Sequence, residues 1–234
     1  MLFSRPELPG DWRYEVKLVA IEAYLPRLLA TLRTHPMAFQ VLYPDRHVNN
    51  VYFDSQDLSR LNQNYAGVGD RCKLRYRWYG DALTGANGHF ELKYKRLKLG
   101  GKHNFPASSP VDLETMPWSE FLSILRKSVT ERAWAEVHNL ARPVILNRYR
   151  RSYFSNAAGT VRVTVDREQR FLNQWNSVRP NLSFEGHRPQ QLVVEVKADA
   201  SNYDDVERTI ASLGLHVSRN SKYVTGVELS CDLG

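Results

Sequence analysis

Apolar and polar residues alternate with a period of two through much of the chain, which is the pattern of half-buried β-strands. Short polar turns, such as the one from Asn156 to Gly159, separate neighbouring segments and predict antiparallel pairing. The expected strands are residues 12–20, 50–53, 70–79, 88–96, 144–154, 160–166, 191–197 and 223–229. A mainly antiparallel sheet follows from this pattern.

Helical periodicity marks four other segments: residues 21–33, a short stretch after Asp54, residues 118 to about 140, and residues 203–213. The last is the best defined, because Asp204 and Asp205 occupy its first turn and Gly214 follows its end. Residues 97–110 and 173–189 are expected to be loops. No repeat or linker divides the chain, so we expect one α+β domain over residues 1–234.

Cations occupy one face of the expected strand 70–79, and apolar side chains occupy the other. The cations are Arg71, Lys73, Arg75 and Arg77. Neighbouring like charges about 7 Å apart repel by roughly 2 kcal/mol at an effective dielectric near 20. The row therefore needs counter-charges opposite it.

Four further strands repeat the division, and a glutamate stands two residues before a lysine at 15–17, 91–93 and 195–197. A solvated face of an ordinary sheet would explain any one strand. The predominance of arginine and lysine across five strands favours a closed barrel, polar inside and apolar outside, with helices covering the outer wall. Such a lumen would hold a polyphosphate and, through its carboxylates, Mg²⁺ or Mn²⁺. An open sheet would count against this tunnel.

Composition narrows the class of protein less than the placement of charge does. The 234 residues include 42% hydrophobic ones, which argues against disorder, and mean hydropathy is −0.48, with no apolar run long enough to span a membrane. Cys72 and Cys231 match no metal or redox spacing, which favours a reduced cytoplasmic protein. The formal charge of +7 predicts a polyanionic partner without deciding which.

Six segments in order resemble the VTC (vacuolar transporter chaperone) polyphosphate polymerase domain of the triphosphate tunnel metalloenzyme superfamily, whose members include the CYTH-like proteins. They are RYEVK at 13–17, VYFDSQDL at 51–58, KLRYRWYG at 73–80, ELK at 91–93, VRVTVD at 161–166, and VVEVK at 193–197 followed by SKY at 221–223. The resemblance implies an eight-stranded antiparallel tunnel barrel and ATP-dependent polyphosphate synthesis with Mn²⁺ or Mg²⁺. ATP and polyphosphate or pyrophosphate are the implied partners.

Carried over residue by residue, the resemblance also implies a site. The catalytic cations would be Lys17, Arg75, Arg77, Lys93, Arg151, Arg162 and Lys222. Further substrate contacts would come from Arg71, Lys73, Lys95, Lys102, Tyr149, Lys197 and Ser221. Glu195 would hold the metal with Glu15, although Glu15 and Glu91 could instead pair with cations. The register of Arg148, Arg150 and Arg151 stays open, because a slip of one residue exchanges the inward side chains.

Arg13 stands where the hydrolytic CYTH branch has the first glutamate of its Glu-x-Glu-x-Lys strand, which favours holding a phosphate chain over activating water. Two alternatives remain: a tunnel triphosphatase acting on tripolyphosphate or a nucleoside triphosphate, and a non-catalytic module that binds polyphosphate or nucleic acid. Trp78, Tyr79 and Trp175 could stack bases in such a module, but Trp78 is on the apolar face and we expect no nucleic acid. A membrane-protein partner would place the chain at the inner face of a membrane.

Overall fold

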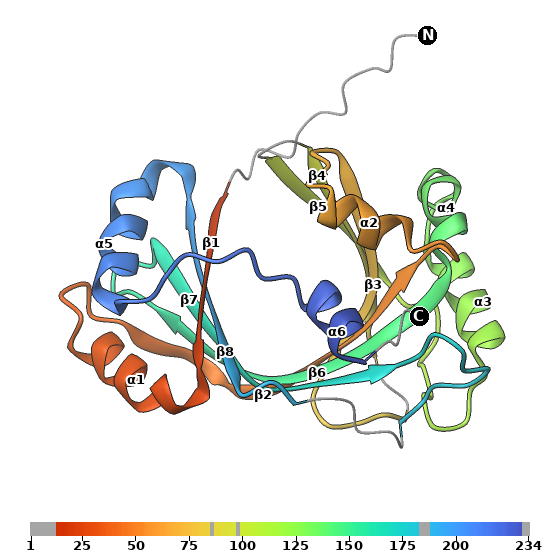
Figure 1. Ribbon diagram of the computed structural model, residues 1–234, viewed down its shortest axis with the longest axis horizontal. Coiled ribbons are helices and arrows are strands. Elements are labelled where there is room, and N and C mark those ends of the chain that lie inside the picture. Colours follow the sequence, from red (N-terminus) through yellow and green to blue (C-terminus); the bar gives the residue numbers. More distant parts are fainter. Residues whose placement is uncertain (1–12, 85–86, 97–98, 183–187, 231–234) are drawn as a thin grey trace, which may run out of the picture.

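The computed structural model describes residues 13–84, 87–96, 99–182 and 188–230. Its eight strands form one antiparallel sheet in the order β1-β8-β7-β6-β2-β3-β4-β5. The strands are β1 (Arg13–Ile21), β2 (Gln40–Asp54), β3 (Arg71–Tyr79), β4 (His89–Arg96), β5 (Leu99–Pro106), β6 (Arg142–Ser155), β7 (Val161–Asn173) and β8 (Gln191–Asp199). The sheet is strongly curved and follows a U in projection (Figure 1).

Helices cover the outer, apolar face of the U (Figure 1). On one flank, α1 (Leu25–Thr34) and α5 (Tyr203–Leu213) bury Leu28, Leu32 and Val206 against the valines of β7 and β8. On the other flank, α3 (Trp118–Ser128) buries Phe121 among side chains of β2, β3 and β4, with α4 (Glu131–Val137) beside it. The predicted arrangement, with the apolar face outside under helices, is therefore present.

The segment 223–229 is a helix and not the strand that its valines and tyrosine predicted. It forms α6 (Lys222–Ser230), which lies inside the U (Figure 1). Tyr223 and Val227 are buried, and a Cβ on Gly226 would come within 2.6 Å of Phe171 and 2.9 Å of Ile145. This close packing against β6 and β7 outweighs the strand preference of the residues.

Other element boundaries also differ from the sequence prediction. Most of the expected loop 97–110 is occupied by β5, a strand whose glycines at 100 and 101 weaken the sequence signal. The predicted helix 118–140 is divided into α3, α4 and a 3₁₀ turn, because Thr130 accepts a hydrogen bond from the Ala133 N–H and starts a new helix. Asp54 is a helix-start residue, as expected: its carboxylate accepts hydrogen bonds from the backbone of Arg60 and Leu61 in α2 (Ser59–Tyr65).

The expectation of a closed barrel is wrong for the backbone in the described ranges. β1 and β5 are the two edges of the sheet and do not pair with each other. Side chains nevertheless cross the opening, since Lys93 Nζ on β4 lies 3.4 Å from Glu15 Oε2 on β1. The fold is therefore a curved open sheet with side-chain contacts between its arms. No helix in the described part of the chain is long and apolar enough to cross a bilayer.

Candidate functional site

The strand register brings opposite charges together on the inner face of the sheet. In the β1–β8 pair, Lys17 stands opposite Glu195 and Glu15 opposite Lys197. In the β3–β4 pair, Arg75 stands opposite Glu91. We call the inner-face group that results the concave cluster. Its members are Glu15, Lys17, Lys73, Arg75, Arg77, Glu91, Lys93, Arg151, Asp166, Glu195, Lys197 and Lys222.

One half of the concave cluster is built around Glu195 and Asp166. Lys197 Nζ lies 2.8 Å from Glu195 Oε2, and Lys17 Nζ lies 3.5 Å from Glu195 Oε1. Arg151 bridges the two acids, with Nε 2.5 Å from Asp166 Oδ1 and Nη2 3.7 Å from Glu195. Lys222, the first residue of α6, completes this half at 2.6 Å from Asp166 Oδ2.

The other half of the concave cluster is built around Glu91. Arg75 donates from Nε to Glu91 Oε2 at 2.8 Å, while Arg77 Nη1 and His89 Nε2 lie 3.5 and 3.0 Å from Oε1. Tyr149 connects the halves: its hydroxyl accepts from Arg77 at 3.4 Å, and Lys222 Nζ lies 4.7 Å from its ring centroid. Glu91 therefore pairs with cations, which was one of its two expected roles.

The surrounding cations keep the acids of the cluster ionised in spite of burial. Burial and the nearby Glu195 oppose ionisation of Glu15, but three lysines of the cluster outweigh both and lower its pKa to about 2. Burial likewise opposes ionisation of Glu195 and Asp166, and surrounding cations still hold both pKa values below their ordinary range. Eight basic groups then face four carboxylates, so the described inner face has a surplus of positive charge.

Lys73 lies where this surplus is least compensated. Its cross-strand neighbour is Lys93, and its ammonium donates to the Ser221 hydroxyl at 2.9 Å. Burial, followed by the charges of Arg71, Lys17 and other cations, lowers its pKa to about 7. An anion placed beside Lys73 would restore the charged form of the amine.

We expect Lys73→Met to be more stable than the wild type at pH 6, with a difference that shrinks towards pH 10. The pKa of Lys73 is near 10.5 in the unfolded chain and about 7 in the folded one. The cost of burying the charged amine therefore lowers the stability of the wild type in full below pH 7, and this cost disappears as the pH rises from 7 to 10.5. The slope is at most about 1.4 kcal/mol per pH unit. Urea unfolding of both proteins across pH 6–10 measures the difference in their unfolding free energies. A difference that does not change with pH would contradict the lowered pKa of Lys73.

Besides Tyr149 and Ser221, which contact members of the concave cluster, four predicted site residues lie outside it. Arg162 stands opposite Lys197 on β7, is exposed, and makes no ion pair with another residue of the described ranges. Lys102 on β5 is exposed opposite Lys93, and Arg71 donates to the Val68 carbonyl at 3.4 Å. Lys95 pairs with Arg71 in the β3–β4 register, and its side chain lies outside the described part of the structure.

The structure settles which arginine of β6 faces the concave cluster. Arg151 points to Asp166, whereas Arg148 contacts His47 and Asp81, and Arg150 lies near Asp45. Sequence reasoning missed Asp166 as a member of the cluster. Its signal was present, because Asp166 alternates in phase with Arg162 and Thr164 along β7.

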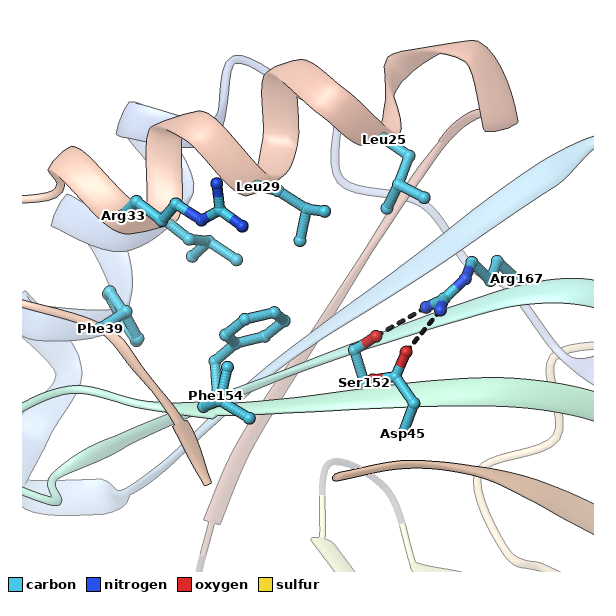
Figure 2. A pocket seen from close by; sticks show the side chains of 10 residues that line it. Leu25, Leu29, Arg33, Phe39, Asp45, Ser152, Phe154 and Arg167 are labelled. Carbon is cyan, nitrogen blue, oxygen red and sulfur yellow. Dashed lines mark hydrogen bonds and ion pairs between the residues drawn. The ribbon is translucent and has the colours of Figure 1, made fainter. Parts of the chain in front are cut away.

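A separate cavity of about 210 Å³ lies under α1 on the outer side of the sheet (Figure 2). Leu25, Leu29 and Phe154 supply much of its apolar wall. Arg167 lies at its edge and is already paired, 2.5 Å from Asp45 and 2.6 Å from the Ser152 hydroxyl. The cavity shares none of the residues of the concave cluster.

Solved structures with the same fold come from proteins of low sequence identity. A Vibrio parahaemolyticus protein provisionally assigned as an adenylate cyclase aligns with a TM-score of 0.50 and 12% identity, over 92% of this chain and 97% of its own. A Hippeastrum protein, provisionally assigned as an adenylyl cyclase and described as having a dominant triphosphatase activity, aligns with a TM-score of 0.53 and 18% identity. That alignment covers 92% of this chain and 94% of the other. The chain thus shares its overall fold with these two proteins.

The sequence identifies the family directly. The VTC domain family matches residues 11–231, which is nearly the whole chain. The chain therefore belongs to the VTC domain family, and the resemblance carried by its six segments is confirmed. None of the curated proteins matches the sequence.

Proposed function

We propose that this chain is a polyphosphate polymerase that transfers the γ-phosphoryl group of ATP to a growing polyphosphate chain on the concave face. The observation that carries the proposal is the concave cluster itself, in which seven basic groups contact four carboxylates and an eighth, Lys73, has no carboxylate partner among the described residues. A cluster with this surplus favours a ligand of high negative charge density. Membership of the VTC domain family supports the same substrate class.

The basic side chains differ in what they offer a phosphate chain. Arg75 and Arg77 present planar forks that suit two oxygens of one phosphate, while Lys17, Lys93 and Lys197 act as point charges. Each of these five already contacts a carboxylate, so the acids hold the cations in position before substrate binds. Positioned charge of this kind supplies much of the catalysis in phosphoryl transfer.

The proposed reaction needs no general base from the protein. A terminal oxygen of the polyphosphate chain attacks the γ-phosphorus of ATP, the bond between the γ-phosphorus and the β–γ bridging oxygen breaks, and ADP leaves. The attacking oxygen is already deprotonated at neutral pH, so no proton has to move. His89, which borders the concave cluster with Nε2 3.0 Å from Glu91 Oε1, is not required as a base.

Glu15 and Glu195 fit a divalent metal shared with substrate. Both are ionised, both contact Lys17 and Lys197, and carboxylate oxygens suit Mg²⁺ or Mn²⁺. Among the described residues no group of three or more acidic, histidine or cysteine side chains forms a cage, so substrate phosphates would supply the remaining ligands. A metal bound there would neutralise phosphate charge and align the donor with the acceptor.

Incubation with ATP and Mn²⁺ should yield long polyphosphate on a gel, together with ADP. Glu195→Gln should lose the product and bind Mn²⁺ more weakly in titrations with tripolyphosphate present, because the carboxylate charge is removed at constant shape. Glu207→Gln, on the outer helix α5, is the matched control and should behave as the wild type. Stoichiometric orthophosphate without polymer would instead identify a triphosphatase, and binding without turnover a non-catalytic module.

A further inference from the structure

Three tyrosines and one arginine form a second group on the inner face, beyond the concave cluster. The Arg46 guanidinium carbon lies 4.3 Å from the ring centroid of Tyr79, 4.9 Å from that of Tyr153 and 5.8 Å from that of Tyr43. Arg46 also donates from Nε to the Tyr153 hydroxyl at 3.0 Å. We call these four residues the tyrosine–arginine group.

The tyrosine–arginine group lies at the end of the inner face away from α6. That helix packs on Ile145 of β6, and the strand then runs through Tyr149 and Arg151 to Tyr153. At about 3.3 Å per residue, roughly 26 Å of strand separates Ile145 from Tyr153. The phosphate-binding side chains lie between the two, so the group borders the concave cluster on the side that α6 leaves uncovered.

Contact between the two groups is direct. Arg46 stands opposite Arg151 in the β2–β6 register, and the Arg151 guanidinium carbon lies 6.0 Å from the Tyr153 ring centroid. Along β6, Arg151 and Tyr153 are two residues and about 7 Å apart, and both side chains point to the inner face. This spacing matches a ribose placed between a phosphate at Arg151 and a base at the rings.

The rings are also accessible to a ligand. Tyr79 is 42% exposed and Tyr43 is 52% exposed, and Arg46 makes no ion pair with a carboxylate of the described residues. The exposed surface of these rings and the charge of Arg46, which is unpaired within the described ranges, are therefore available to a ligand. Aromatic rings and guanidinium planes are the surfaces on which nucleobases stack.

We propose that the tyrosine–arginine group is the subsite for the nucleobase of the nucleoside triphosphate. This inference rests on the proposed function, because it takes the triphosphate to occupy the concave cluster. Stacking uses the face of a base and not its hydrogen-bonding edge, so ATP and GTP should bind with similar affinity. The subsite would thereby distinguish a nucleotide donor from the inorganic phosphate chain that accepts.

The test compares ATP, supplied as a β,γ-imido analogue that cannot transfer its γ-phosphoryl group, with inorganic tripolyphosphate, each titrated calorimetrically with Mn²⁺ into the wild type and Tyr79→Ala. Loss of one stacking ring should weaken ATP binding about tenfold and leave tripolyphosphate binding within about twofold. Tyr79→Phe keeps the ring and should restore ATP binding. Tyr14→Ala, which removes an exposed tyrosine stacked on Tyr203 away from this group, is the matched control.

Two results overturn the inference while leaving the proposed function intact. Equal weakening of ATP and tripolyphosphate in a folded Tyr79→Ala protein would show that the ring only supports the fold, and unchanged ATP binding would show that no base stacks there. If Tyr79→Ala does not fold, Tyr43→Ala gives the same comparison at a more exposed ring. A wild type that binds neither ligand would refute the proposed function, and the inference with it.

Discussion

Arg75→Ala should lower the rate of polyphosphate synthesis by at least about 100-fold, the loss typical of removing one preorganised donor from a phosphoryl or acyl transfer site. Arg75 is the arginine whose Nε is fixed 2.8 Å from Glu91 and whose Nη1 reaches the Tyr52 hydroxyl at 3.4 Å. Its fork is therefore positioned before substrate arrives. Gel analysis of polymer and coupled measurement of ADP, at saturating ATP and Mn²⁺, quantify the loss.

Two variants show whether the loss reflects the guanidinium fork. Arg75→Lys keeps the charge but not the second donor, so it should fall between the wild type and Arg75→Ala. Arg126→Ala removes an arginine paired with Glu131 on the outer helices and should retain full activity. Near-ultraviolet circular dichroism checks folding. Retention of more than half the wild-type rate in a folded Arg75→Ala protein would remove Arg75 from the proposed mechanism.

Asp166→Asn should cost about 3–5 kcal/mol of unfolding free energy, because it leaves buried cations without their counter-charge. The Asp166 side chain is fully buried and contacts both Arg151 and Lys222. Arg151 keeps a second carboxylate at Glu195, whereas Asp166 is the acid that Lys222 contacts among the described residues. Urea denaturation followed by circular dichroism measures the difference.

The same variant separates electrostatic loss from simple repacking. Tripolyphosphate should restore part of the lost stability of Asp166→Asn, since a bound anion supplies the missing negative charge. Arg162→Gln, an exposed change on the same strand, should stay within about 0.5 kcal/mol of the wild type. A loss below 1 kcal/mol in Asp166→Asn would show that the two cations do not depend on this carboxylate.

Much of the inner face could be predicted from alternation alone. A period of two assigns Lys73, Arg75 and Arg77 to one face whatever the neighbouring strands are, because strand geometry fixes it. The same reasoning placed Glu15 and Lys17 on one face of their strand, and Glu195 and Lys197 on one face of theirs. The cross-strand register then determines which opposite charges meet, and a single sequence does not state the register directly.

The features that the sequence did not predict, a C-terminal helix and an open sheet, depend on contacts between distant segments. The C-terminal segment has the composition of a strand, and only its packing on Phe171 and Ile145 through Gly226 makes it a helix inside the sheet. Lys222 was nonetheless expected in the site, and it arrives there on a different element. Closure failed as a prediction for a similar reason, since pairing between β1 and β5 depends on the curvature of all eight strands.

The position of α6 inside the sheet also determines when the site can assemble during folding. Lys17 on β1 donates to the Asn220 carbonyl, a contact between residues 203 positions apart, and Lys222 joins Asp166 from the same end of the chain. Such long-range contacts form late and slow folding, because loop closure precedes any gain from them. A ribosome must therefore release almost all of this sequence before the concave cluster is complete.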